Sequence, residues 1–243
     1  MKTHSKFALI TGGNKGLGFE ICRQLAAEGY TILLGARDLD RAQDAVEKLT
    51  AEGSTVIPIL LDVTSAGSIA SAVLAVREIS PVLDVLVNNA GIIEGGRLPP
   101  LELSIEEMRT VYETNVFGPV AMIQAFLPLL RESTAGRIVN MSTSLSSLQR
   151  LSDPLWEHAD IKMMGYCTSK TALNATMVVI AHALKDTRIK INNADPGYCA
   201  TDLNDHSGPR SAEQGARIAV KLATLPDDAP SGGLYNDEGS VAW

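Results

Sequence analysis

The sequence lacks the features that mark secreted, membrane-bound and metal-binding proteins. Its three cysteines, Cys22, Cys167 and Cys199, are widely spaced and odd in number, so neither a disulfide framework nor a zinc site is predicted. The four histidines lie outside any metal-binding pattern. No apolar run is long enough to cross a bilayer, and the first apolar stretch lacks the length and cleavage site of a signal peptide. We therefore expect a cytoplasmic protein without a bound metal or a membrane partner.

Positive charge is also scarce. The 21 Lys and Arg residues face 28 Asp and Glu residues, which gives a formal net charge of -7. A nucleic-acid partner is therefore not expected, although a local basic pocket can still hold a phosphate. Hydrophobic residues make up 45% of the 243 positions and charged residues 20%, so the chain can bury a large core and is not disordered. The length fits a single domain spanning residues 1–243.

Short apolar segments alternate with helical patterns along the chain. The predicted strands are 7–10, 31–34, 56–60, 85–87, 137–141, 190–193 and, more weakly, 233–235. Most are rich in Val, Ile and Leu without polar alternation, as in strands covered on both faces. The predicted helices are 18–28, 39–51, 69–79, 105–131 and 166–185. This order predicts an α/β fold with a doubly wound parallel sheet, the Rossmann fold, whose ligand crevice lies at the carboxyl ends of the strands.

A glycine-rich loop follows the first predicted strand, with the sequence Thr11-Gly12-Gly13-Asn14-Lys15-Gly16-Leu17-Gly18. Glycines at such a place let the chain turn tightly and let backbone amides approach a pyrophosphate at a helix N-terminus. A glycine pattern alone is weak evidence, because an ordinary strand-to-helix turn also explains it. The position between the first strand and an amphipathic helix makes phosphate binding the better interpretation.

Further motifs follow at the ends of strands and in the long helices. In chain order they are Asp62-Val63, Asn88-Asn89-Ala90-Gly91, Asn115, Ser142-Thr143-Ser144, Tyr166-Cys167-Thr168-Ser169-Lys170, and Pro196-Gly197 with Thr201. Together with the Gly-x-x-x-Gly-x-Gly spacing, this order resembles the short-chain dehydrogenase/reductase family over essentially the whole chain. The Gly-Gly-Asn-Lys-Gly loop and Trp243 are similar to the monomeric NADPH-dependent carbonyl reductases.

The resemblance implies an oxidoreductase that transfers a hydride from NADPH to the carbonyl group of a small ketone or aldehyde. It also implies a set of residues that hold NADP(H). These are Gly12, Asn14, Lys15, Gly16, Leu17, Gly18, Arg37, Asp62, Val63, Asn89, Ala90, Gly91, Tyr166, Lys170, Pro196, Gly197 and Thr201.

The choice between NADP(H) and NAD(H) depends on the end of the second strand. NAD-preferring relatives have an acidic residue there that binds the ribose 2′-OH, whereas this chain has Ala36 followed by Arg37. Arg37 and Lys15 supply two cations that suit a 2′-phosphate. The alternative is that both are solvated surface charges. We expect the neighbouring Asp38 to cap the helix that follows.

The Tyr-x-x-x-Lys motif predicts acid–base chemistry. Tyr166 and Lys170 are four residues apart on a helix and share one face, and an ammonium group near a phenol lowers its pKa from about 10. By the resemblance, Tyr166 is the acid in reduction and the base in oxidation. Lys170 also binds the nicotinamide ribose, and Asn115 holds a water that relays protons towards Lys170.

The hydroxyl group that polarises the substrate carbonyl is less well defined. Relatives have Asn-Val-Ser-Ser, with the second serine catalytic, where this chain has Asn140-Met141-Ser142-Thr143. The comparison selects Thr143, which keeps the hydroxyl donor but adds a methyl group that narrows the pocket. Ser142 and then Ser144 are the alternatives.

Two other functions stay open. One is an NAD(P)-dependent secondary alcohol dehydrogenase that works in oxidation, and the other is a noncatalytic NADP-binding regulator. The intact Asn115, Tyr166 and Lys170 disfavour the regulator.

The stretch before the catalytic tyrosine is longer than in compact tetrameric relatives. It contains Leu155, Trp156, Ile161, Met163 and Met164, apolar enough to cover the helices through which tetrameric relatives associate. This predicts a monomer. The alternative is a loop that only frames the substrate pocket and leaves an oligomer possible.

Overall fold

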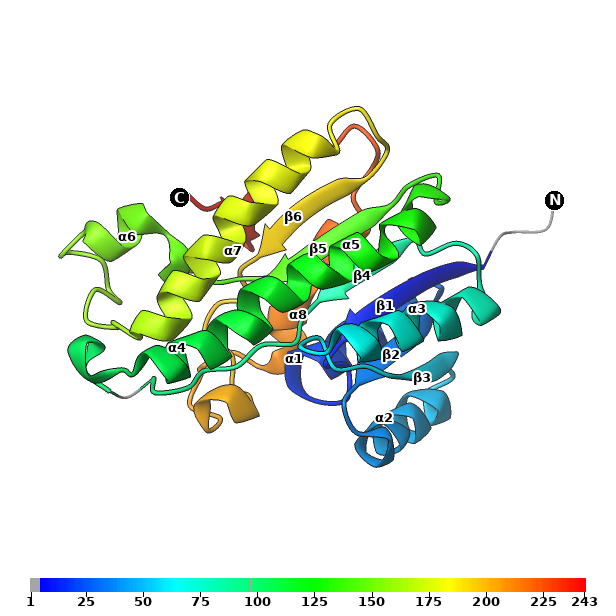
Figure 1. Ribbon diagram of the computed structural model, residues 1–243, viewed down its shortest axis with the longest axis horizontal. Helices are drawn as coiled ribbons and strands as arrows, with labels where there is room; N and C mark the ends of the chain where they lie inside the picture. The colour runs from blue at the N-terminus through cyan, green and yellow to red at the C-terminus, as the bar shows by residue number, and fades with distance from the viewer. Residues whose placement is uncertain (1–4, 97) are drawn as a thin grey trace.

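A computed structural model describes residues 5–96 and 98–243, so the first four residues and residue 97 of the expected domain lie outside the described part (Figure 1). An eight-stranded sheet runs through this part in the order β3-β2-β1-β4-β5-β6-β7-β8. The strands are β1 Lys6–Thr11, β2 Tyr30–Ala36, β3 Val56–Leu60, β4 Val85–Asn88, β5 Arg137–Met141, β6 Lys190–Ala194, β7 Leu234–Asn236 and β8 Gly239–Ser240. All neighbours pair in parallel except β7 and β8. The predicted doubly wound parallel sheet is confirmed, and the antiparallel β8 was not predicted.

Helices cover both faces of this sheet, as Figure 1 shows. The helices are α1 Gly16–Ala27, α2 Leu39–Ala51, α3 Ala66–Ile79, α4 Ile105–Tyr112, α5 Gly118–Arg131, α6 Leu148–Ser152, α7 Met164–Ala183 and α8 Ala212–Ala223. One core layer joins α1, α2 and α8 to the sheet, and the other joins α3, α5 and α7. Successive strand residues alternate between the layers: Ala8 and Ile10 enter the first, and Leu9 enters the second. This explains why the strands are apolar without alternation.

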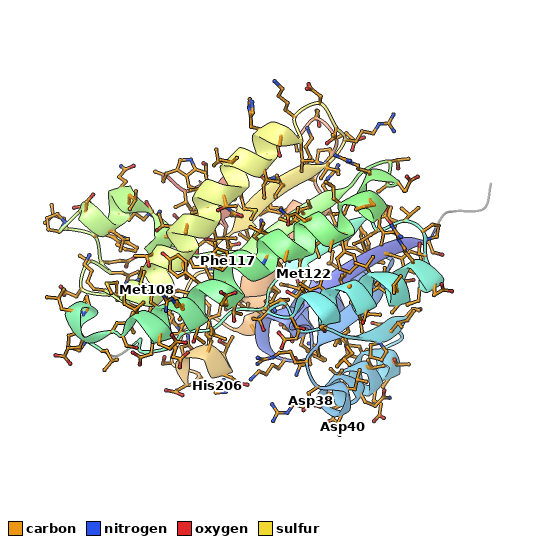
Figure 2. The ribbon with its side chains drawn as sticks, viewed as in Figure 1. Asp38, Asp40, Met108, Phe117, Met122 and His206 are labelled. Atoms are coloured by element: carbon orange, nitrogen blue, oxygen red, sulfur yellow. The ribbon has the colours of Figure 1, made fainter. Side chains whose placement is uncertain are left out.

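Most predicted boundaries are close to those observed, and α2 begins and ends where predicted. Asp38 caps α2 as expected, because its side chain accepts hydrogen bonds from the backbone N–H groups of Asp40 and Arg41 (Figure 2). The predicted helix 105–131 is interrupted by a π-helical turn, Glu113–Phe117, between α4 and α5. Within the described residues, none of the helices combines the length and apolarity that a membrane crossing requires.

Candidate active site

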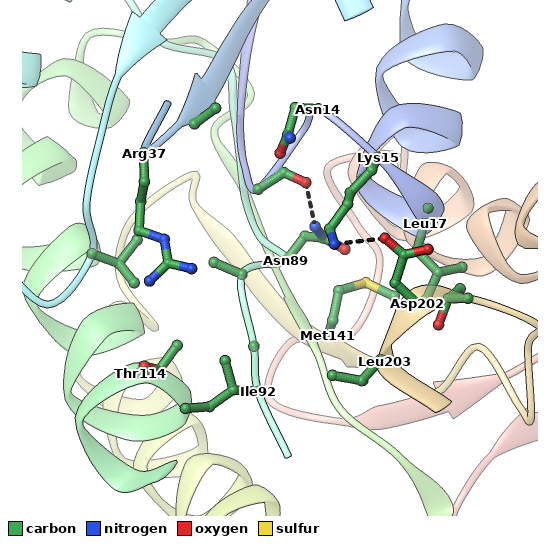
Figure 3. Close-up of a pocket in the computed structure, with 18 of the residues that line it drawn as sticks. Asn14, Lys15, Leu17, Arg37, Asn89, Ile92, Thr114, Met141, Asp202 and Leu203 are labelled. Carbon is green, nitrogen blue, oxygen red and sulfur yellow. Dashed lines mark hydrogen bonds and ion pairs between the residues drawn. The ribbon is translucent and has the colours of Figure 1, made fainter. Parts of the chain in front are cut away.

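The glycine loop forms one wall of a cavity of about 360 Å³, which we call the glycine-loop cavity (Figure 3). Gly12 and Gly16 have φ values of 63° and 55°, which side chains rarely adopt. A Cβ atom at Gly18 would lie 2.2 Å from the carbonyl oxygen of Gly12. The backbone therefore approaches itself more closely than any residue but glycine allows, and the cradle that results leaves room for a phosphate-bearing ligand at the start of α1.

Almost all of the predicted cofactor residues line this cavity. Those that do are Gly12, Asn14, Lys15, Gly16, Leu17, Gly18, Arg37, Asp62, Val63, Asn89, Ala90, Gly91, Tyr166, Lys170, Pro196 and Thr201. Gly197 instead lines a second cavity beside it. Residues that were not predicted from the sequence also line the glycine-loop cavity, among them Ile92, Thr114 and Leu203. Ile92 directly follows the Asn-Asn-Ala-Gly motif, whereas only tertiary structure brings Thr114 and Leu203 here.

Hydrogen bonds join the glycine loop to the loop after β4. The Asn89 side-chain amide donates to the carbonyl oxygens of Thr11 and Gly12 at 2.9 and 3.1 Å. The Thr11 hydroxyl oxygen accepts from the backbone N–H groups of Asn89 and Ala90, both at 2.9 Å. The two loops approach each other closely because Gly18 has no side chain that would collide with Gly12 or Asn89. The hydrogen bonds between the loops then fix the shape of the cradle.

The two cations expected at a 2′-phosphate lie at different places on the cavity wall. Figure 3 shows the Arg37 guanidinium directed into the cavity from the end of β2. Burial by itself raises the pKa of the Asp62 carboxyl. The hydrogen bonds from Thr64 and the positive charge of Arg37 act in the opposite direction, and together they lower this pKa below its usual value. The Lys15 ammonium is 2.6 Å from a carboxylate oxygen of Asp202, and both side chains are exposed. Lys15 is therefore a paired charge on this wall rather than an isolated one.

The predicted Tyr166 and Lys170 pair shares one face of α7. The Lys170 ammonium is 5.8 Å from the centre of the Tyr166 ring and donates to the carbonyl oxygen of Met141 at 2.8 Å. Burial lowers the pKa of Lys170 to about 8. Burial raises the pKa of Tyr166, and the charges of Asp195 and Cys167 raise it further. The expected lowering of this pKa by Lys170 stays a prediction.

Asn115 lies fully buried in the π-helical turn, behind the tyrosine and lysine. Its side-chain oxygen accepts from the backbone N–H of Ile92 at 2.9 Å, and its amide donates to the Ile92 carbonyl at 3.0 Å and to the Ser169 hydroxyl at 3.1 Å. A Cβ atom at Gly91 would lie 3.4 Å from this oxygen and 3.5 Å from the Lys170 nitrogen. The site thus brings Asn115 close to Lys170. Such π-helical turns are common at functional sites.

The three candidate hydroxyl groups after β5 differ in their hydrogen bonds. Ser142 donates its proton to the side-chain oxygen of Asn174 at 2.8 Å, and Ser144 donates to the carboxylate of Asp195. The Thr143 oxygen accepts from the backbone N–H of Leu145 at 3.2 Å, and among the described residues no acceptor takes its proton. Thr143 lines the second cavity together with Tyr166.

A row of buried asparagines holds this hydroxyl-bearing loop in place. Asn88, Asn140 and Asn193 stand side by side on β4, β5 and β6. Each side-chain amide donates to the next residue's oxygen, at 2.8 and 3.0 Å, and Asn193 donates to Asn174 on α7 at 3.0 Å. Asn174 then donates to the hydroxyl of Ser146 at 2.6 Å. The row explains why the hydroxyl groups of Ser142 and Ser146 are both bonded to Asn174.

The second cavity has a volume of about 860 Å³ and is lined by the segment that precedes α7. Trp156, Ile161 and Met163 lie on its wall, whereas Leu155 is 91% exposed. The segment therefore frames a pocket, and the predicted covering role over the helices is wrong. Phe117 in the π-helical turn, labelled in Figure 2, is exposed, and so is Val179 on α7. The monomer stays a prediction, but the segment before α7 no longer supports it.

The two cavities meet at a shared set of side chains. The residues that line both are Leu17, Tyr166, Pro196, Thr201 and Leu203. Tyr166 thus separates the cradle built for a phosphate-bearing ligand from a larger cavity with apolar and polar walls. In the described part of the chain, no group of three or more His, Cys, Asp or Glu residues is placed to hold a metal ion.

Comparisons with known proteins agree with this geometry. The family model for short chain dehydrogenases matches residues 6–212. A short-chain dehydrogenase of Penicillium roqueforti, anuI, is 39% identical, with 96% of this chain and 94% of that protein covered. The (+)-neomenthol dehydrogenase of Capsicum annuum is 31% identical, with 95% of each chain covered. The structure of an NADPH-bound carbonyl reductase from chicken fatty liver superposes with a TM-score of 0.85 at 27% identity, covering 99% of this chain and 100% of the other.

Proposed function

The chain belongs to the short-chain dehydrogenase family of oxidoreductases, and on that premise we propose that it reduces the carbonyl group of a small ketone or aldehyde with NADPH. The observation that carries this proposal is the position of Tyr166, which among the described residues is the one phenol that lines both the glycine-loop cavity and the second cavity. A cofactor in the first cavity and a substrate in the second would meet at this phenol.

The glycine-loop cavity fits NADPH in shape and charge. The cradle at Gly12, Gly16 and Gly18 brings backbone to the start of α1, where a phosphate can accept hydrogen bonds from backbone N–H groups. Arg37 supplies a positive charge at the end of β2, and the neighbouring carboxylate of Asp38 caps α2. NADPH bound here would supply a hydride to the substrate carbonyl. The NADPH-bound carbonyl reductase with the same fold supports this choice of cofactor.

The side chains around the boundary supply the proton. Tyr166 carries its proton at neutral pH, as a phenol with an ordinary pKa of about 10 also does, and it lies where a general acid can neutralise the developing alkoxide. Thr143 has a hydroxyl proton left to donate to the carbonyl oxygen, which polarises it. We assign Lys170 to the cofactor ribose and to proton return to Tyr166, and Asn115 to holding the relay water beside Lys170.

The same geometry bears on the alternatives. Reduction and alcohol oxidation use the same Tyr166 phenol in opposite directions, so the alcohol dehydrogenase stays an alternative, which steady-state kinetics in both directions would decide. A noncatalytic regulator would not need Thr143, Tyr166 and Lys170 assembled at the wall between two cavities. We further propose that residues 1–243 form one domain.

Replacing Tyr166 with phenylalanine tests the proposal. NADPH binding, measured by fluorescence titration, should stay nearly unchanged, whereas turnover on a panel of carbonyl compounds should fall by roughly two orders of magnitude or more. Tyr198→Phe is the matched control, since Tyr198 lines the second cavity but its hydroxyl bonds to Ser207. Wild-type turnover by the Tyr166→Phe protein would overturn the assignment.

A further inference from the structure

An ion pair joins the glycine loop to the turn that follows β6. The Lys15 ammonium lies 2.6 Å from one carboxylate oxygen of Asp202, and the other oxygen lies 3.0 Å from Nε2 of His206. Lys15 and Asp202 both line the glycine-loop cavity, and more than half of each side chain is exposed. The pair therefore stands in the wall of the space proposed to take NADPH, where both a ligand and solvent can reach it.

Hydrogen bonds that do not involve Lys15 hold Asp202 in place. Asp202 opens a short 3-10 helix that ends at Asn204. The Asn204 side chain accepts from the backbone N–H of Thr201 at 3.1 Å and donates to the carbonyl oxygen of Cys199 at 2.7 Å. Removing the charge of Asp202 should therefore leave the backbone of this turn where it is.

The pair turns Lys15 away from the other cation of the cavity. Figure 3 shows the Lys15 side chain directed towards Asp202, whereas Arg37 enters the cavity from the end of β2. No ion pair of the described residues involves Arg37. Of the two cations assigned to a 2′-phosphate, one thus has no carboxylate partner and the other already has one.

A carboxylate next to Lys15 opposes a 2′-phosphate in either of two geometries. If the ammonium turns to the phosphate, the ion pair is lost and Asp202 is left with His206. If the ammonium binds both groups, Asp202 and the phosphate place like charges around one cation, and like charges repel. NADH has no 2′-phosphate that could draw Lys15 away from Asp202.

On the basis of the proposed function, we propose that Asp202 is a specificity-determining residue for the cofactor: it competes with the 2′-phosphate of NADPH for Lys15 and so reduces the preference of the site for NADPH over NADH. The lowered pKa of Asp202, whose largest cause is the hydrogen bond from Lys15, agrees with a pair that is formed at neutral pH. Because the pair is exposed, we expect a modest effect of about threefold on the preference.

Asp202→Asn removes the charge and keeps the shape of the side chain. The quantity to measure is the Kd of NADH divided by the Kd of NADPH, from fluorescence titrations of the full chain without substrate. An effect of Asp202 on the pyrophosphate, which both cofactors contain, cancels in this ratio. The ratio should rise about threefold at about 0.01 M salt, and the gain should shrink at about 1 M salt because salt screens exposed charges.

A control variant makes the same change of net charge elsewhere. Glu213→Gln breaks a comparably exposed ion pair with Arg217 on α8, and neither residue lines the two cavities. The ratio should stay at the wild-type value in this protein. Asp202→Ser, a second neutral variant at the proposed position, should agree with Asp202→Asn.

The Lys15→Ala background separates competition from other roles of Asp202. Without the ammonium there is nothing to compete for, so adding Asp202→Asn should no longer change the ratio. The inference is overturned if the neutral Asp202 variants leave the ratio unchanged, or if the gain persists without Lys15. A lower ratio would also overturn it, since Asp202 would then be holding Lys15 ready for the phosphate.

Binding and turnover are measured separately, so the two proposals can fail separately. If the ratio behaves as expected but the wild type reduces no carbonyl, the proposed function fails and the role of Asp202 stands. If the wild type reduces carbonyls with NADPH and the ratio does not move, only the inference fails. A wild type that binds neither cofactor would overturn both.

Discussion

Replacing Lys170 by methionine should make the protein more stable while it abolishes turnover. Lys170 is buried against the Met141 carbonyl, and among the described residues no carboxylate pairs with it. Burial disfavours its charged form and lowers its pKa from 10.5 to about 8. The folded protein therefore maintains a buried ammonium group at neutral pH, at a cost that a methionine of similar length does not carry.

The size of this cost follows from the two pKa values. At about 1.4 kcal/mol per pKa unit, the shift corresponds to about 3 kcal/mol below pH 8, where Lys170 is charged in both states. Between pH 8 and 10.5 the unfolded chain holds more protons than the folded one, so stability rises with pH and the cost disappears. The lost hydrogen bond to Met141 offsets about 1 kcal/mol. The net gain is about 2 kcal/mol at pH 7, or roughly 4–8 °C in Tm for a chain of this size.

Urea denaturation of both proteins at pH 7 and pH 9.5 measures the effect. The Lys170→Met protein should unfold at higher urea at pH 7, and its advantage should shrink to near zero by pH 9.5, as about half of the cost has gone from the wild type by then. Lys221→Met, on the exposed side of α8, is the control and should show no such pH dependence. The reasoning would be refuted if the Lys170→Met protein were less stable than the wild type at pH 7. It would also be refuted if the difference in stability between the two proteins were the same at both pH values.

Two further predictions concern the cofactor and the substrate hydroxyl. Lys15→Ala with Arg37→Ala should weaken NADPH binding much more than NADH binding, because only NADPH has the 2′-phosphate; equal weakening of both in fluorescence titrations would contradict a phosphate site. Thr143→Ala should lower kcat by roughly 100-fold, the scale of a lost oxyanion donor, whereas Ser142→Ala should lower it much less since the Ser142 proton is used by Asn174. Steady-state kinetics that reverse this order would show that the hydroxyl assignment is wrong.

The sheet was predictable because its signals are local. Each strand from β1 to β6 carries an apolar run that two helical layers cover, and each run ends in a recognisable motif such as the glycine loop after β1 or the asparagines after β4. Helix α2 was predicted in full because its cap at Asp38 and its apolar stripe lie within one segment. The weak signal of β7 reflects its three-residue length, and β8 is only two residues long.

The π-helical turn and the cavities could not be predicted in this way. Asn115 stabilises the turn through Ile92 and Ser169, residues far from it in the chain, and a regular helical pattern from 105 to 131 gives no sign of these contacts. The apolar composition of the segment before α7 is compatible both with a cover over neighbouring helices and with the wall of a substrate pocket. Whether Trp156 packs on a helix or lines a pocket depends on the chain path, which the structure alone provides.

The three hydroxyl groups after β5 can be told apart only by their hydrogen-bond acceptors, which the sequence motif does not reveal. Three consecutive hydroxyl residues follow β5, and their order in the chain does not distinguish them. Asn174, four residues beyond Lys170 on α7, takes the proton of Ser142, and Asp195 takes that of Ser144. Among the described residues no acceptor takes the proton of Thr143, and this is why we propose it as the donor to a substrate in the second cavity. The proposed chemistry requires a hydroxyl proton beside Tyr166 that no other group accepts. The hydroxyl groups of Ser142 and Ser144 donate their protons within the protein. A threonine can therefore take the position where relatives have serine.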